Sequence, residues 1–486
     1  MSSHVLAIDA GTTGITLLLF NKVGEVVRKV HAEFRQHYPK PGWVEHDAEE
    51  IWEVTKRLID EIMGDDPRDS VTAIGITNQR ETTVIWDKTT GKPYGRAIVW
   101  QCRRTADRCR ELASSEGVFR DRTGLVLDAY FSGTKASWIL EHNEAAAAGA
   151  RAGNARFGTI DTWLIDRLSG GRLHVTDPTN ACRTLMYDIH EKAWSDDLLG
   201  LLGVPRSMLP EVKPSSAVYG TTDASVFGAE VPIAGAVGDQ QAATFGQLCV
   251  KPGDSKNTYG TGCFTVVIAG HEKVEPRTGL LLTLACDETG APVYAHEGSI
   301  FVAGAVVQWL RDEMKMIDRA EETDALARSV PDTAGVHLVP AFAGLGAPYW
   351  DPDARGAVLG LTRGAGRAHI VRAALESIAY QTRDLMEALG GAKAALRVDG
   401  GAAANDFLMQ FQADLLGVNV LRPSNLETTA QGAAYLAGLA TGYWSGFDEI
   451  REFRKIDRIF EPKLDQTARD DLYKHWQAAV RRVRTN

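Results

Sequence analysis

The sequence predicts an α/β protein built from two domains of the same topology, with a catalytic cleft between them. A short apolar strand at Val5–Ile8 is followed by a Gly-Thr turn at Asp9–Gly14 and a second strand at Ile15–Phe20. The same order returns later, where a strand at Lys256–Tyr259 enters the turn Gly260–Gly262 and another strand follows. Glycines let such turns fold tightly, so their backbone N–H groups can converge on phosphate oxygens. The repeat predicts a duplicated domain that faces itself across a cleft.

The chain of 486 residues is long enough for two such domains, each with a large apolar core. The segment Val250–Asp254 contains a Pro-Gly turn that interrupts the pattern of strands and helices. We therefore expect the first domain at 1–249 and the second at 255–486.

In the first half, a helix is predicted near Asp47–Met63, with Asp47 as N-cap and Glu50 completing a capping box. The β-rich run Val71–Thr77 then leads to Arg80 and Glu81. Neighbouring side chains of a regular strand point to opposite faces, so these two can share a ligand only where the pleat ends. Such a pair suits the adjacent hydroxyls of a polyol. An ordinary surface ion pair is the alternative that the residues leave open.

Asp239 follows the apolar run Ile233–Val237 and a glycine, which places it at the carboxyl end of a predicted strand. Open α/β sheets bind their ligands at that end. A carboxylate in this position is a candidate general base. An acidic turn without chemistry is the alternative.

In the second half, Ser299–Lys315 has the pattern of a helix, in which Gly304 and Gln308 lie one turn apart and share a face. A nucleotide could contact that face. The sequence contains no GxxxxGK[ST] motif, which excludes the P-loop mode of ATP binding.

A long amphipathic helix is predicted at Arg367–Leu389, ended by Gly390-Gly391. A buried strand at Leu396–Val398 then leads to a second glycine pair that includes Gly401, and Asn405 begins the next helix. Glycine at this turn lets a nucleotide approach the backbone closely. A plain strand-to-helix turn is the alternative.

Composition excludes several classes of protein. The formal net charge of −10 argues against nucleic acid as a partner, because such binding relies on Lys and Arg. No apolar run approaches the roughly 18 residues of a membrane span. The six cysteines are scattered without a CxxC pair, which indicates free thiols, and the first strand leaves no room for a signal peptide. We expect a cytoplasmic protein that forms a homo-oligomer, either a dimer or a tetramer.

The two Gly-Thr hairpins resemble those of the sugar-kinase, hexokinase and actin superfamily, whose fold consists of two actin-like (ribonuclease H-like) domains. Within it, the chain is similar to the glycerol kinases, of the carbohydrate-kinase family that also contains xylulose and gluconate kinases. The resemblance runs nearly end to end. It is most specific in the combination of residues 78–83 (NQRETT), 100–104 (WQCRR) and 238–241 (GDQQ), and the shared phosphate hairpins are less specific.

The resemblance implies Mg²⁺ and ATP as cofactors, and transfer of phosphate from ATP to glycerol to give sn-glycerol 3-phosphate. It assigns Asp239 as the general base and Asp9 to the metal, held through water. The implied glycerol-binding residues are Arg80, Glu81, Trp100, Tyr130, Asp239, Gln240 and Phe264. The implied nucleotide-binding residues are Thr12, Thr13 and Gly14 in the first turn, Thr261 in the second, and Gly304, Gln308, Gly401 and Asn405.

One position departs from the family pattern. Glycerol kinases commonly continue the first turn as Gly-Thr-Thr-Ser-Ser-Arg, whereas this chain has Thr16 in the place of the arginine. We expect Mg²⁺ and the backbone N–H groups to carry more of the phosphate charge here.

Two other functions remain open from the residues. A kinase for a longer sugar or polyol would share the hairpins and Asp239. A non-catalytic ATP-binding module would keep Asp9 and the glycine turns without a polyol site.

Overall fold

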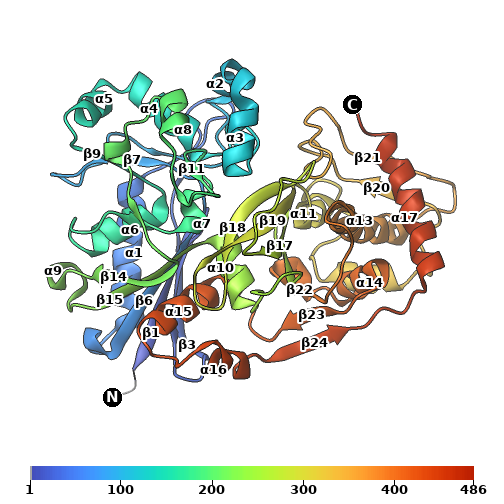
Figure 1. Cartoon of the computed structure of the whole chain (residues 1–486). Helices are drawn as coiled ribbons and strands as arrows, with labels where there is room; N and C mark the ends of the chain where they lie inside the picture. Colours follow the sequence, from blue (N-terminus) through green and yellow to red (C-terminus); the bar gives the residue numbers. More distant parts are fainter. Residues whose placement is uncertain (1–2, 486) are drawn as a thin grey trace.

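The computed structural model describes residues 3–485, and Figure 1 shows the two halves of the chain side by side, each built on its own sheet. The N-terminal sheet has the strand order β14-β15-β6-β1-β2-β3, and the C-terminal sheet has the order β18-β19-β17-β16-β22-β23-β24. The N-terminal strands are β1 (His4–Ala10), β2 (Gly14–Phe20), β3 (Val26–Glu33), β6 (Val71–Asn78), β14 (Ser216–Thr221) and β15 (Pro232–Gly238). The C-terminal strands are β16 (Ser255–Tyr259), β17 (Cys263–Gly270), β18 (Leu281–Cys286), β19 (Pro292–Ile300), β22 (Leu396–Asp399), β23 (Val420–Pro423) and β24 (Ile456–Phe460).

The two sheets share one topology. In the first, β3, β2 and β1 are antiparallel, and β6 and β15 then continue in parallel with β1. In the second, β19, β17 and β16 are antiparallel, and β22 and β23 continue in parallel with β16. The duplicated α/β fold predicted from the two hairpins is therefore confirmed.

Smaller elements surround the sheets. In the first half they are β4 (Gln36–His37), β5 (Glu45–His46), α1 (Ala48–Met63), β7 (Val84–Asp87), β8 (Ala97–Ile98), α2 (Ala106–Glu111), α3 (Glu116–Thr123), α4 (Ser132–His142), α5 (Glu144–Arg151), β9 (Ala155–Gly158), α6 (Ile160–Leu168), β10 (Val175–Thr176), α7 (Pro178–Ala181), β11 (Tyr187–Asp188), β12 (Ala193–Trp194), α8 (Asp196–Leu202), β13 (Glu211–Val212), α9 (Ala224–Phe227) and α10 (Asp239–Gly246). In the second they are α11 (Gly304–Asp312), α12 (Glu322–Arg328), β20 (His337–Val339), β21 (Ala357–Leu359), α13 (Arg367–Ala388), α14 (Asp406–Leu416), α15 (Thr428–Ala440), α16 (Phe447–Glu452) and α17 (Gln466–Arg481).

Helix α1 begins as predicted, because the Asp47 side chain accepts hydrogen bonds from the N–H groups of Glu49 and Glu50. The predicted capping box is wrong in its second half. The Glu50 carboxylate accepts from the backbone N–H of Arg35, at 3.0 Å, instead of returning to the N-cap. A tertiary contact to the connection between β3 and β4 has replaced the local one.

Helices α10 and α15 cross in the middle of the molecule (Figure 1), and two glycines allow the close approach. A Cβ at Gly246 would lie 2.1 Å from the carbonyl oxygen of Thr428, and one at Gly432 would lie 1.9 Å from that of Ala242. Helix α15 also covers one face of the N-terminal sheet, where its alanines join an apolar core with Val5, Ala7, Leu18 and Phe20. The chain thus returns to its first sheet near its end.

The helix predicted at Ser299–Lys315 is shorter in the structure. Ser299 and Ile300 end strand β19, where they pair with Phe264 and Cys263, and α11 begins only at Gly304. Sheet pairing overrides the helical pattern there. Helix α13 closes as predicted, because Gly390 and Gly391 adopt positive φ and their N–H groups return to the last turn.

The C-terminal helix α17 docks on α13 through one buried carboxylate. Asp384 accepts hydrogen bonds from the Tyr473 hydroxyl, at 2.7 Å, and from the Trp476 indole, at 2.8 Å. Burial raises the pKa of Asp384 to about 7, against those hydrogen bonds and the nearby Arg383. In the part of the chain that the structure describes, no helix is long and apolar enough to cross a membrane.

Candidate functional site

The first Gly-Thr turn joins β1 to β2 and holds Thr12, Thr13 and Gly14. A Cβ at Gly14 would lie 2.7 Å from the carbonyl oxygen of Ala32, so the turn fits against β3 only with glycine there. The Thr12 hydroxyl accepts a hydrogen bond from the indole of Trp100 at 3.0 Å, and Thr13 is exposed. The turn therefore links a residue predicted to bind phosphate with one predicted to border the substrate.

The second turn, Gly260–Gly262, is fastened to the start of α11. The carbonyls of Gly260 and Thr261 accept from the N–H groups of residues 303–305. A Cβ at Gly304 would lie 2.6 Å from the Gly260 oxygen, so this contact also needs glycine. Thr261 is exposed at the tip of the turn, and Gln308 is exposed one helical turn beyond Gly304.

Asp9 lies at the end of β1, paired with Thr16 of β2. Burial, together with the negative charges of Asp239 and Glu427, raises the pKa of Asp9 to about 7, with Lys29 opposing. Repulsion between carboxylates of this kind is relieved by a cation, and Mg²⁺ typically takes one or two carboxylates and keeps several waters. The described residues hold no cluster of three or more His, Cys, Asp or Glu side chains arranged for a metal.

Thr16 is neutral, so position 16 supplies no positive charge to the first turn. Its hydrogen-bond partner is not an arginine either. The Thr16 hydroxyl lies 2.9 Å from Nδ1 of His31, which is exposed on β3. An imidazole is the nearest basic group that the hydroxyl contacts.

Arg80 and Glu81 lie where β6 has ended, and the backbone of Glu81 has φ of 62°, in the left-handed region. Few non-glycine residues adopt it, and such strain is concentrated at functional sites. The N–H of Thr82 donates to the Arg80 carbonyl at 2.7 Å, which closes a tight turn. The pleat is broken there, as predicted for two side chains that share one ligand.

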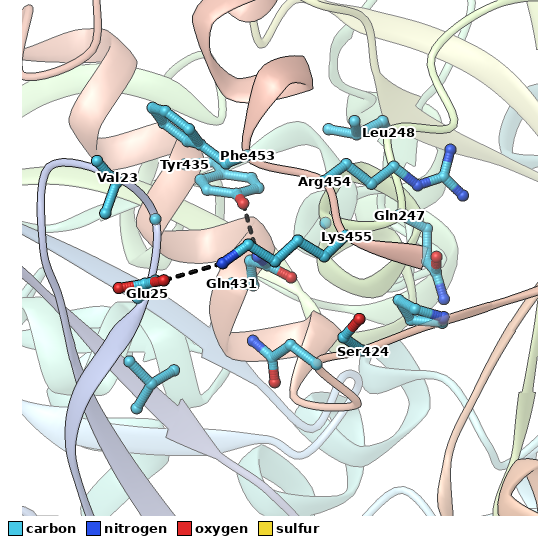
Figure 2. Close-up of a pocket in the computed structure, with 15 residues that line it drawn as sticks. Val23, Glu25, Gln247, Leu248, Ser424, Gln431, Tyr435, Phe453, Arg454 and Lys455 are labelled. Carbon is cyan, nitrogen blue, oxygen red and sulfur yellow. Dashed lines mark hydrogen bonds and ion pairs between the residues drawn. The ribbon is translucent and has the colours of Figure 1, made fainter. Parts of the chain in front are cut away.

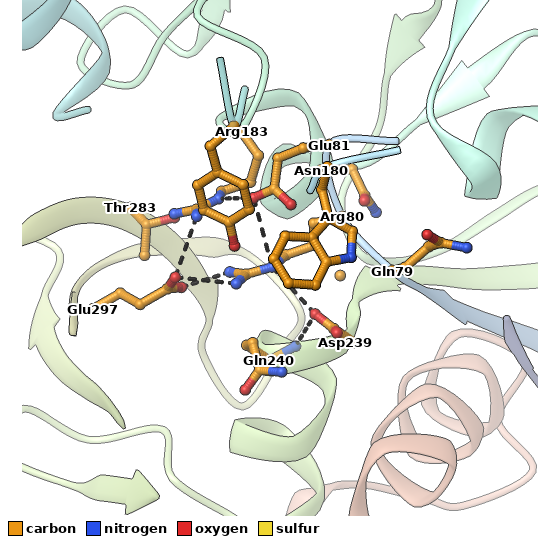
Figure 3. A network of polar contacts seen from close by, with 12 residues as sticks. Gln79, Arg80, Glu81, Asn180, Arg183, Asp239, Gln240, Thr283 and Glu297 are labelled. Atoms are coloured by element: carbon orange, nitrogen blue, oxygen red, sulfur yellow. Dashed lines mark hydrogen bonds and ion pairs between the residues drawn. The ribbon is translucent and has the colours of Figure 1, made fainter. Parts of the chain in front are cut away.

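Arg80 is buried and contacts carboxylates from both halves of the chain (Figure 3). Its Nη1 and Nη2 donate to Glu297 of β19 at 2.5 and 3.0 Å, and its Nε lies 3.1 Å from Oδ1 of Asp239. Burial would raise the pKa of Glu297, but the guanidinium groups of Arg183 and Arg80 lower it to about 2. Glu297 therefore stays ionised and holds Arg80 in place.

Arg183 is the second buried guanidinium of this network. Its Nε donates to Glu81 at 2.6 Å, and its Nη2 lies 3.2 Å from Glu297 (Figure 3). The same guanidinium lies over the ring of Tyr130, 5.4 Å from its centroid, and the Tyr130 ring meets Trp100 edge-on at 5.5 Å. The aromatic residues predicted for the substrate site thus adjoin the charged ones.

Asp239 is the first residue of α10, and its side chain is 31% exposed, which makes it the accessible carboxylate of the network. The buried Gln240 beside it accepts a hydrogen bond from Lys256 of β16 at 2.7 Å. Lys256 also donates to Thr258, whose strand partner is Phe264. Burial lowers the pKa of Lys256, and Asp399 and Asp239 oppose the shift.

The glycine pair after β22 has two different roles in the structure. Gly400 has φ of 85° and packs against the backbone of Tyr259, whereas Gly401 is exposed with open space beside it. Asn405 is the N-cap of α14, as predicted, and its amide also donates to Thr323 at 3.0 Å. Its side chain is therefore already bonded within the protein. Within residues 3–485, no hydrogen bond or ion pair joins Gln308, Gly401 or Asn405 to the charged network around Arg80.

Sequence reasoning missed Glu297, Arg183 and Lys256, which are all buried and charged. Their signal was available only in part. Glu297 is the one carboxylate in the strand PVYAHEGSI, whose other residues are apolar, small or neutral at ordinary pH. Arg183 follows a short buried helix without any local partner.

Comparisons with known proteins agree with this geometry. Residues 4–246 match the N-terminal domain, and residues 255–441 the C-terminal domain, of the FGGY family of carbohydrate kinases. A glycerol kinase of Carboxydothermus hydrogenoformans is 58% identical, over 99% of this chain and 98% of the relative. One of Petrotoga mobilis is 57% identical, over 100% and 99%. A crystal structure of Plasmodium falciparum glycerol kinase with ADP superposes with a TM-score of 0.93 at 35% identity, over 99% of this chain and 98% of that one. The chain belongs to the FGGY family of carbohydrate kinases.

Proposed function

We propose that this kinase transfers phosphate from ATP to glycerol and forms sn-glycerol 3-phosphate. One observation carries the proposal: relatives named glycerol kinase are 57% and 58% identical to this chain over nearly its whole length. The site supports it, because Arg80, Glu81 and the partly exposed Asp239 gather at adjoining strand ends. Charged donors and acceptors at this spacing suit the adjacent hydroxyls of a small polyol.

In the proposed reaction, Asp239 accepts the proton of a primary hydroxyl. The hydroxyl oxygen forms its bond to the transferred phosphorus as the bond from that phosphorus to the nucleoside diphosphate breaks. A positioned base contributes about 10² to 10⁴ in rate. Arg80 and Glu81 fix which hydroxyl is presented to Asp239, and Gln240 adds a hydrogen bond. Trp100, Tyr130 and Phe264 border the carbon edge.

ATP is the proposed phosphoryl donor, and a related glycerol kinase structure contains ADP. The two glycine turns suit its phosphates, because Thr13 and Thr261 are exposed at their tips. We assign the phosphates to Thr12, Thr13, Gly14 and Thr261. The adenosine side is assigned to Gly304, Gln308, Gly401 and Asn405. For Asn405 the contact would come from its backbone or from the remaining lone pair of its side-chain oxygen, since that oxygen already caps α14.

Asp9 suits a Mg²⁺ ion. Its carboxylate is buried and is repelled by the negative charges of Asp239 and Glu427, and a cation would offset both effects. When bound, Mg²⁺ supplies charge neutralisation on the phosphate oxygens. Asp9 would hold the ion through water.

We further propose a cytoplasmic location, where ATP is available and where the six buried cysteines stay reduced. The expected homo-oligomer, a dimer or a tetramer, stays a prediction that sedimentation of the purified chain tests. So do the domain bounds 1–249 and 255–486, which limited proteolysis tests.

A coupled assay of ADP production with glycerol, dihydroxyacetone, xylulose and ribulose tests the substrate. We expect the highest kcat/KM with glycerol. Higher kcat/KM with xylulose or ribulose would favour a kinase for longer sugars, and the assignment to glycerol would fail.

A further inference from the structure

A cavity of about 270 Å³ opens between the two halves of the chain, away from the residues assigned to either substrate (Figure 2). The β2–β3 turn of the N-terminal sheet forms one wall with Val23 and Glu25. The connection from α16 to β24 forms another with Arg454 and Lys455. Helix α15 contributes Gln431 and Tyr435. An occupant would contact elements of both sheets.

The charges around this cavity do not cancel. Lys455 and Glu25 form an ion pair at 2.9 Å, drawn in Figure 2, and neutralise each other. The side chain of Arg454 has no hydrogen bond or ion pair with any residue of 3–485, and its Nε and Nη2 are closed off from solvent. One positive charge is therefore left without a counter-charge.

Asp254 is the carboxylate whose charge acts on Arg454, and it already faces Arg397 at 3.5 Å. Arg397 also donates to the carbonyl of Gln247 at 3.0 Å, so a second cation contacts this lining residue from outside the cavity. Burial lowers the pKa of Arg454, and the like charge of Arg397 lowers it further. A bound anion would offset both the burial and the repulsion from Arg397.

Arg454 is only partly buried, but its closed-off Nε and Nη2 lack any partner, and unsatisfied buried groups in native proteins commonly mark an ion or a ligand. The planar guanidinium matches the two oxygens of a carboxylate or phosphate group. Ser424 and Asn425 add a hydroxyl and an amide to the lining, and the described residues leave the Ser424 hydroxyl and the Asn425 amide nitrogen without an acceptor. Val23, Leu248 and Phe453 supply apolar surface for a carbon skeleton.

We propose that this cavity is a second binding site, which takes the phosphate or carboxylate group of a small metabolite with Arg454 as its counter-charge. In the structure the Arg454 side chain runs beside Leu248 toward Gln247 (Figure 2). The proposed contact requires a change of rotamer along the flexible stem, so that the two closed-off nitrogens turn toward the cavity. The volume exceeds that of a single water, whose share of the liquid is about 30 Å³, by enough for a group larger than phosphate alone. A ligand bridging both walls restrains the movement of the two halves.

The test compares wild type, Arg454→Met and the control Arg451→Met as full chains in a low-anion buffer. Arg451 is exposed on α16, pairs with Asp448 at 3.1 Å and lies outside the cavity lining, so the control removes the same charge nearby. Inorganic phosphate and malonate are titrated separately, and the midpoint of thermal unfolding and the heat of binding are measured. Stabilisation follows the ratio of probe concentration to Kd.

We expect at least one probe to bind wild type and Arg451→Met equally well, and Arg454→Met about tenfold or more weakly. Response to phosphate alone identifies a phosphate ligand, and response to malonate alone identifies a carboxylate. Equal affinity in Arg454→Met places any anion elsewhere, such as the catalytic site, and overturns the proposal. Failure of both probes to bind wild type also overturns it.

Should Arg454→Met fail to fold, Arg454→Lys takes its place. Lysine keeps the charge but lacks the planar fork, so the affinity should fall about fivefold or more. An unchanged affinity in Arg454→Lys would refute the assigned role of the guanidinium. Turnover with glycerol is a separate measurement, so the outcome does not depend on the proposed substrate.

Discussion

Glu297 of the C-terminal sheet accepts two hydrogen bonds, of 2.5 and 3.0 Å, from Arg80 of the N-terminal half. The pair is buried, and Arg183 touches the same carboxylate at 3.2 Å. One carboxylate from the second half thus fixes two guanidinium groups in the first. The substrate site is assembled by both halves together.

Glu297→Gln should destabilise the protein by about 3 to 5 kcal/mol, because two buried guanidinium groups lose their shared counter-charge. Urea unfolding of the variant gives the free energy. The exposed Glu272→Gln serves as the control and should stay within about 0.5 kcal/mol of wild type. A loss below about 1 kcal/mol in Glu297→Gln would mean that the pair contributes little.

Asp239→Asn should fold normally and lose about 10²- to 10⁴-fold in kcat, because the amide keeps the shape of the side chain and cannot accept the proton. Steady-state kinetics measure the loss, and calorimetric binding of glycerol checks that the pocket is intact. Activity within about threefold of wild type would show that Asp239 is not the base.

Arg183→Lys should raise the KM for glycerol about tenfold or more and leave the KM for ATP nearly unchanged. The lysine keeps a positive charge but loses the fork that joins Glu81 and Glu297, and a charged hydrogen bond contributes about 1.5 to 3 kcal/mol. Arg122→Lys, at an ion pair with Asp188 and Asp197, is the matched control. Equal increases in both KM values would point to general disruption and not to a positioning role.

Thr16→Arg should tighten ATP binding about fivefold or more, since a charged donor replaces a neutral one beside the first turn. The KM for glycerol should hardly move. Thr16→Val, which removes the contact with His31 without adding charge, separates the two effects. If the nucleotide affinity and kcat/KM for ATP both stay put in Thr16→Arg, position 16 does not serve the phosphates.

The free energy of unfolding should fall as pH rises from about 4 to about 7, because Asp384 loses its proton in this range. Its pKa in the folded chain is raised to about 7, so the folded state retains a proton that the unfolded state has released, and that contribution to stability is lost through this window. The slope is at most about 1.4 kcal/mol per pH unit. Asp384→Asn should flatten the profile of unfolding free energy against pH, whereas the exposed Asp318→Asn should not. Parallel profiles for wild type and Asp384→Asn would contradict the assignment.

The local sequence pattern was sufficient to predict the hairpins, the strand before Asp239 and the caps at Asp47 and Asn405. Each depends on residues within a few positions of one another, where glycine turns and alternating apolar residues act directly. The break in the pleat at Glu81 was also foreseeable, because strand β6 runs out of apolar residues there.

Long-range pairing was not foreseeable. Arg80 and Glu297 are 217 positions apart, and Glu81 and Arg183 are 102 apart, so no local pattern connects them. The same cause explains the misplaced start of α11, since Ser299 and Ile300 are held in a strand by residues of β17. The side-chain bond of Asn405 to Thr323 likewise depends on a neighbour that the local sequence does not reveal.

The position of α15 also orders events during synthesis of the chain. Val5, Ala7 and Phe20 belong to a sheet face that the ribosome produces early, whereas the helix that covers it begins at Thr428. Until more than four hundred further residues have emerged, that apolar face lacks its natural cover. The nascent N-terminal half is therefore the stage at which chaperones are most needed and aggregation is most dangerous, and the chain reaches its finished core only when translation is almost complete.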